Sequence, residues 1–142
     1  MYVSDAKRLT TEGARKIKNA AVKAAEKAGI PITVAVVDAG GHLLVLERMD
    51  GGKFHSVHSA TTKAVCAASS KRNTGSQGAV GQSLDMLHAL GLALAAGPER
   101  WTPMEGGCPI MIGDECIGGV GVAGGNWEFD EKVAREAVEA IK

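Results

Sequence analysis

The sequence has few aromatic residues, with two Trp, two Phe and one Tyr among its 142 residues. It also lacks an excess of charge, since sixteen Lys and Arg balance sixteen Asp and Glu. The absence of a basic excess or a basic stripe argues against nucleic-acid binding. No run reaches the roughly 18 apolar residues of a transmembrane helix, and the first residues lack the apolar segment of a signal peptide. We therefore expect a cytoplasmic protein with neither a nucleic-acid nor a membrane partner.

Cysteine is also scarce, and the three residues Cys66, Cys108 and Cys116 are an odd number. Free thiols are therefore expected in place of a disulfide framework. Glycine, in contrast, is abundant with nineteen residues, and alanine supplies much of the apolar content. Because stabilisation by burial scales with the apolar area removed from water, a core built from alanine gains little. Association into a homo-oligomer would bury more, and we expect it for this single domain of residues 1–142.

Periodicity and turn signals predict four helices and two hairpins. Hairpins dominate and no parallel strand–helix–strand unit is evident, so we expect an α+β fold with an antiparallel sheet of about five strands and packed helices. The predicted helices cover residues 5–28, 55–69, 83–96 (with Ser83 as the N-cap) and 127–141, and the predicted strands cover 33–37, 42–48, 109–112 and 116–122, with one more near 101–106.

Two of the predicted helices have unusual faces. Helix 83–96 is apolar nearly all round, which favours contact with a second surface, most simply another subunit. Helix 55–69 separates into two stripes when it is plotted at 100° per residue. One stripe is made of small residues suited to close packing on a sheet (Val57, Ala60, Ala64, Ala67 and Ala68), and the opposite stripe is polar (His55, His58, Ser59, Thr62 and Cys66).

The segment from Gly119 to Gly124 matches the pattern G-x-G-x-x-G of dinucleotide-binding folds. Such a fold needs a helix and then another parallel strand with an acidic residue, and too few residues follow Gly124 to form them. The match is therefore spurious as a dinucleotide fingerprint. The glycines favour close approach to the backbone, either by a helix or by a flat ligand.

His55 and His58 lie three residues apart on one face of the predicted second helix. A catalytic zinc site needs a third ligand and a base, and neither is evident. One imidazole could instead be the axial ligand of a haem, which needs only one or two axial atoms and an apolar slot. Each histidine alone could equally be a solvated or interface residue.

The cluster Arg48-Met49-Asp50-Gly51 combines an Arg and a carboxylate beside the start of the second helix. Free N–H groups at a helix start favour anions, and Arg48 could bind a carboxylate with two hydrogen bonds. Alternatively the cluster is structural, with Asp50 capping the helix or pairing with Arg48 or Lys63.

Five segments follow one another in the order 35–41 (AVVDAGG), 48–51 (RMDG), 63–64 (KA), 106–110 (GGCPI) and 117–122 (IGGVGV). Together they resemble the GlcG/HbpS-like haem-binding (haem-degrading) family, which also forms the C-terminal domain of PduO-type cobalamin adenosyltransferases. The resemblance covers residue 5 to the end. It implies a profilin-like or PAS-like fold and assembly into oligomers. It also implies that the gene lies beside genes for glycolate, diol or glycerol utilisation. The motifs carry over Arg48, Met49, Asp50, Lys63, Gly106, Gly107 and Gly118–Gly121.

We expect a small-ligand-binding protein, with haem or another tetrapyrrole as the ligand, that supports a metabolic operon without catalysis of its own. Its cleft would lie between the second helix, the turn at Arg48 and the Gly106-Gly107 segment. Arg48 or Lys63 would neutralise propionates, and His55 or His58 would ligate the iron.

Two alternatives remain open. The protein could be an enzyme that acts on a small carboxylate or hydroxy acid, with Arg48 holding the acid and Asp50 or His55 as general base. It could also be a non-catalytic assembly partner of a corrinoid-dependent dehydratase.

Overall fold

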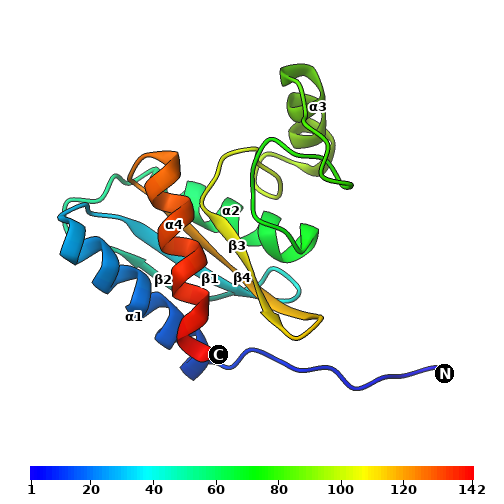
Figure 1. Ribbon diagram of the computed structural model, residues 1–142, viewed down its shortest axis with the longest axis horizontal. Helices are drawn as coiled ribbons and strands as arrows, with labels where there is room; N and C mark the ends of the chain where they lie inside the picture. The colour runs from blue at the N-terminus through cyan, green and yellow to red at the C-terminus, as the bar shows by residue number, and fades with distance from the viewer.

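The computed structural model describes residues 1–142 and contains one antiparallel sheet with helices on both faces (Figure 1). The predicted α+β class is confirmed, but the sheet has four strands, because residues 101–106 form no strand. The elements are α1 (Thr11–Ala28), β1 (Thr33–Asp38), β2 (Leu43–Arg48), α2 (Ser56–Ser70), α3 (Met86–Ala96), β3 (Gly107–Ile112), β4 (Glu115–Ala123), α4 (Trp127–Ala137) and the short 3-10 helix η1 (Val138–Ile141).

The strands lie in the order β2-β1-β4-β3, so the two hairpins meet along β1 and β4 in the middle of the sheet. Every neighbouring pair is antiparallel. Side chains alternate between the two faces of a strand, and this alternation divides the central strands into a valine face and a small-residue face. Val34 and Val36 of β1 pair with Val122 and Val120 of β4.

Helices α1 and α4 cover the valine face (Figure 1). The cluster between them contains 17 buried residues, among them the fully buried Ile17, Ile32 and Ile110. Large branched side chains fill this layer and bury much apolar area, which is the main source of hydrophobic stabilisation. This is the principal core of the molecule.

Helix α2 covers the other face, where only six buried residues form a cluster: Ala35, Val37, Ala60, Ala64, Ala68 and Ala123. The glycines of β4 explain the close approach. A Cβ on Gly119 would overlap the carbonyl oxygen of Ala64, and one on Gly121 would overlap the carbonyl oxygen of Ala60. Packing against a helix is therefore the role of these two glycines.

Two helix starts differ from the predictions, because capping side chains determine them. Helix α1 begins at Thr11 and not near residue 5, since the Thr10 side chain accepts a hydrogen bond from the Gly13 N–H and caps the helix. Helix α3 begins at Met86, capped by Asp85 in place of Ser83. Ser83 instead forms an isolated β-bridge with Gln77.

Helix α3 projects away from the sheet and its covering helices (Figure 1). Of its residues only Ala89 is buried, while five large apolar side chains are exposed: Met86, Leu87, Leu90, Leu92 and Leu94. The helix therefore leaves an apolar surface uncovered within this chain. No helix in the structure has both the length and the apolar character needed to cross a membrane.

Candidate ligand-binding site

A cavity of about 580 Å³ lies beside the polar face of α2. Its walls come from α2, from the segment 98–105 that leads into β3, and from the turn 123–127 between β4 and α4. A cavity of this size is in the range of small-molecule and cofactor sites. The expected cleft at the Arg48 turn and the Gly106-Gly107 segment is thus displaced, because neither segment lines the cavity.

The α2 wall is made by His55, His58, Ser59 and Thr62, which share one face of the helix. Both histidines are exposed, whereas Thr62 is buried deeper along the same face. The fifth residue of the predicted polar stripe, Cys66, lies beyond the cavity, where its thiol contacts the Thr102 carbonyl oxygen at 3.7 Å. Burial raises the pKa of that thiol, so Cys66 is a buried neutral thiol.

The lining outside α2 mixes apolar and polar side chains. Both tryptophans of the chain, Trp101 and Trp127, line the cavity, together with Pro103 and the thioether of Met104. Lys53 adds an exposed cation on the α2 side of the cavity. The walls therefore combine two imidazoles, a thioether, flat apolar side chains and a cation.

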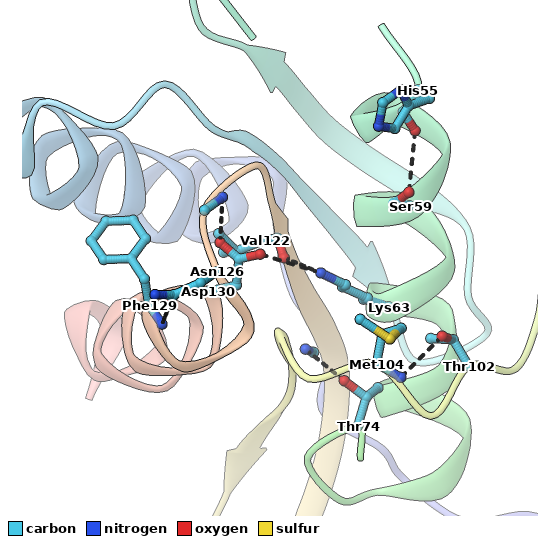
Figure 2. Close-up of polar contacts among 12 residues, drawn as sticks. His55, Ser59, Lys63, Thr74, Thr102, Met104, Val122, Asn126, Phe129 and Asp130 are labelled. Atoms are coloured by element: carbon cyan, nitrogen blue, oxygen red, sulfur yellow. Dashed lines mark hydrogen bonds and ion pairs between the residues drawn. The ribbon is translucent and has the colours of Figure 1, made fainter. Parts of the chain in front are cut away.

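Lys63 lies in the interior of the cavity and is the most unusual residue there, because it is a lysine with only 6% of its surface exposed. Its Nζ donates to the Val122 carbonyl oxygen at 2.9 Å and lies 3.5 Å from Oδ2 of Asp130 (Figure 2). Asp130 is also buried, and its Oδ1 accepts from the Gly125 N–H at 2.9 Å. This buried ion pair connects α2, β4 and α4.

Burial and mutual attraction act in opposite directions on the pair. Desolvation lowers the pKa of the Lys63 ammonium, and attraction to Asp130 and Glu105 offsets only part of that effect. Desolvation likewise raises the pKa of the Asp130 carboxyl, against the attraction of Lys63 and hydrogen bonds from the Gly125 and Gly124 backbone. Both shifts favour the uncharged forms, because a low-dielectric site penalises charge.

Gly106 and Gly107 lie against Lys63 and do not line the cavity. Gly106 has φ +123°, and a Cβ there would stand 2.9 Å from the Lys63 Nζ. The Gly107 N–H donates to the Thr74 hydroxyl at 2.8 Å (Figure 2). These glycines make room for α2 and its lysine.

The Arg48 turn is held by contacts of its own. The Arg48 Nη1 donates to the Gly52 carbonyl oxygen at 2.7 Å, and the Ile32 N–H donates to the Met49 sulfur at 3.4 Å. Asp50 is exposed in this turn. The structure therefore brings His55, His58 and Lys63 together at one cavity and places Arg48, Met49 and Asp50 elsewhere.

Several cavity residues were not anticipated from the sequence, namely Lys53, Trp101, Met104, Glu105, Trp127 and Asp130. Three of them lie in the turn-rich stretch before β3, and Lys53 lies in the turn before α2, where periodicity carries no signal. Asp130 lies in the first turn of α4, where acidic residues ordinarily complement the helix dipole. No group of three or more His, Cys, Asp or Glu side chains is arranged to hold a metal ion.

Comparison with known proteins places the chain in a family. Residues 9–139 match the model of the family described as haem degrading protein HbpS-like. Protein GlcG of Escherichia coli is 32% identical over 81% of each chain. Among solved structures, the Klebsiella pneumoniae protein ORFY has a TM-score of 0.84 at 32% identity, with 99% of this chain and 95% of that chain covered.

A structure described as a PduOC:heme complex has a TM-score of 0.83 at 28% identity, with 96% of both chains covered. These similarities agree with a profilin-like arrangement of the sheet and helices. The family resemblance that the ordered segments from residue 35 to residue 122 suggested is thereby confirmed. The chain belongs to the HbpS-like family.

Proposed function

We propose that this protein binds haem, or another tetrapyrrole of similar shape, in the cavity beside α2. The observation that carries the proposal is the pair His55 and His58, which stand one helical turn apart at a cavity that both tryptophans also line. Haem needs an axial donor and an apolar slot, and this cavity offers both. A similar solved structure is described as a heme complex, which supports the same assignment.

The residues around the cavity fit the parts of the cofactor. Either histidine can supply the axial nitrogen, and Trp101 and Trp127 can cover the flat macrocycle. Lys53 is the cation suited to a propionate, because it is exposed and has no ion-pair partner in the structure. Lys63 is less suited, since a propionate there would stand close to the Asp130 carboxylate. Arg48 points into its own turn.

A haemin titration followed by the Soret band tests the proposal. The chain has four histidines, so two matched controls exist: His42 and His88 are exposed and lie outside the cavity. We expect a saturable, sharp Soret band in the parent protein, unchanged by His42→Ala or His88→Ala. One of the two variants His55→Ala and His58→Ala, the one that loses the axial ligand, should lose this band or bind haem at least tenfold more weakly. A tenfold loss of affinity corresponds to about 1.4 kcal/mol.

Two results would contradict this assignment. A broad, non-saturating rise in absorbance would show adventitious binding to apolar surface. A parent-like spectrum and affinity in the variant that lacks both His55 and His58 would exclude these residues as axial ligands, even if haem binds.

The second part of the proposal is that the protein is a homo-oligomer associated through α3. Leu87, Leu90 and Leu94 are 76%, 54% and 70% exposed, and α3 carries no charged residue. A second copy would cover this surface with its own apolar helix. The apolar area buried between the copies would add to the small area buried beneath α2. We expect Leu87→Asp/Leu90→Asp to shift the molar mass from light scattering to that of one chain. The double variant Lys16→Asp/Lys23→Asp, on the exposed face of α1, is the matched control and should leave it unchanged.

A further inference from the structure

Lys63 lines the cavity, and its amine has one hydrogen-bond donor without a partner. An ammonium has three donors, but the structure gives Nζ only two acceptors, the Val122 carbonyl oxygen at 2.9 Å and the Asp130 carboxylate at 3.5 Å. The residue lines the cavity although it is 94% buried overall, as its 6% exposure shows. The side chain therefore borders the cavity and is shielded from solvent elsewhere.

The residues around Lys63 restrict the position of its amine through more contacts than the ion pair with Asp130 alone. Gly106 has no side chain where a Cβ would stand 2.9 Å from Nζ. Asp130 is fixed in turn by the Gly125 N–H. The nitrogen is thus anchored from α4 and β4 and reaches across the gap between α2 and these elements (Figure 2).

We infer that Lys63 is a nucleophilic amine that forms an imine with a small uncharged aldehyde bound in this cavity. This goes beyond tetrapyrrole binding and does not depend on it. A lysine removed from solvent retains more of its neutral, nucleophilic form, which is the property of lysines that form Schiff bases.

The reaction balances without a further reactant. The Lys63 nitrogen attacks the carbonyl carbon and forms a C–N bond, and the carbonyl oxygen takes up one proton to give a carbinolamine. The C–O bond then breaks, and the oxygen leaves as water that carries both protons lost by the nitrogen. No electron transfer is involved. The cavity is open to solvent, so the water can leave.

The charges around Lys63 favour an uncharged substrate. Asp130 of α4 and Glu105 before β3 act on Lys63, and β4 contributes only a backbone carbonyl. A 2-oxo acid bound at the amine would place its carboxylate near both of these acids. A neutral aldehyde avoids this repulsion, and its chain can lie against Trp101 and Trp127 while Thr62 offers a hydroxyl.

Reductive trapping on the haem-free protein tests the inference. The protein is incubated with butanal and cyanoborohydride, and modified lysines are located and timed by peptide mass spectrometry. Lys53 is the internal comparison, because it lines the same cavity but is exposed. We expect Lys63 to be alkylated faster than Lys53 near neutral pH, because burial lowers the pKa of the Lys63 ammonium and leaves more of the amine neutral. Pyruvate should trap at Lys63 more slowly than butanal.

Variants separate chemistry from structure. Lys63→Arg keeps the positive charge but cannot form an imine, and Lys132→Arg changes an exposed lysine on α4 as the matched control. Asp130→Asn removes the charge that favours the ammonium, so its rate profile at Lys63 should move to lower pH while modification continues. A lysine that the aldehyde cannot reach would give no modification at Lys63 in either protein.

Alkylation of Lys63 no faster than Lys53 between about pH 6 and about pH 9 would overturn the inference, and this result comes from the parent protein even if a variant fails to fold. Trapping by pyruvate but not by butanal would overturn the assignment to an uncharged aldehyde. Because haemin is absent, failure of haem binding leaves this experiment intact, and failure here leaves the Soret titration intact.

Discussion

The two faces of the sheet stabilise the molecule in different ways. Below α1 and α4, 17 buried residues include large branched side chains such as Ile17 and Ile110. Below α2, six buried residues are almost all alanine, and the glycines of β4 bring the helix backbone against the strand. One face gains from buried apolar area, and the other gains from close backbone approach with little area.

This difference explains where the candidate site lies. A helix that packs through its smallest side chains leaves its longer, polar side chains on the far side, where α2 borders the cavity. The buried Lys63–Asp130 pair then connects the thin layer to α4. The valine face therefore buries most of the apolar area, and the α2 face borders the candidate site.

The largest expected effect on stability follows from breaking the ion pair. Lys63→Met leaves the Asp130 carboxylate buried without its partner, and this should cost about 3–5 kcal/mol in the free energy of unfolding measured by urea denaturation. The double variant Lys63→Met/Asp130→Leu should recover most of that loss, because an apolar pair of similar volume requires no desolvation.

The loss in Lys63→Met should depend on pH. Burial raises the pKa of Asp130 in the folded state, so folding favours its protonated form. The stability contributed by that form is fully present below the unfolded pKa of about 3.9 and disappears as the pH rises through the folded pKa. The deficit relative to the parent protein should therefore grow as the pH rises above about 4. A deficit independent of pH would show that the carboxylate is not the cause.

Truncation on the two faces should sharpen the comparison between them. Ile17→Ala in the α1 layer should cost about 3 kcal/mol, because it removes buried methylene groups and leaves a cavity. Ala64→Gly on α2 should cost about 1–2 kcal/mol, mostly through helix propensity. Thermal or chemical unfolding of both variants checks the ratio, and equal losses would contradict the division into a thick and a thin layer.

Adding a methyl group under α2 should destabilise the protein, because the close packing of this helix leaves no room for it. Gly121→Ala places a Cβ against the Ala60 carbonyl oxygen, so α2 must shift, at a cost of about 2 kcal/mol. Gly91→Ala in α3 is the matched control, because a Cβ there meets nothing within 4 Å. It should stabilise the protein by about 0.5–1 kcal/mol through helix propensity. Unfolding by urea measures both, and a neutral Gly121→Ala would contradict the close packing of α2.

Several features could be predicted from residues alone. The alternation of valine with glycine in residues 119–122 and the small-residue stripe of 60, 64 and 68 both anticipate a helix packed closely on a sheet. The polar stripe likewise anticipated that His55 and His58 share one face of α2, which borders the cavity. The expected fifth strand near residue 101 was wrong, because its turn-forming residues wrap around the cavity and pair with no strand.

The partners of each site residue could not be predicted, because they come from distant parts of the chain. Asp130 is 67 positions from Lys63, and no local pattern indicates that the start of α4 will lie against the middle of α2. The charged cluster at residues 48–51 suggested Asp50 as one partner of Lys63, whereas the structure pairs Lys63 with Asp130.

The sequence by itself determined the element types, the alternation of faces and the family, because these depend on local periodicity and on ordered motifs. Only the tertiary structure decided which polar residues share a cavity. That decision depends on the order β2-β1-β4-β3, which places the end of β4 and the start of α4 beside α2 and leaves the Arg48 turn at a separate position. Contacts between distant segments arise from packing the whole sheet, and no single stretch of residues encodes them.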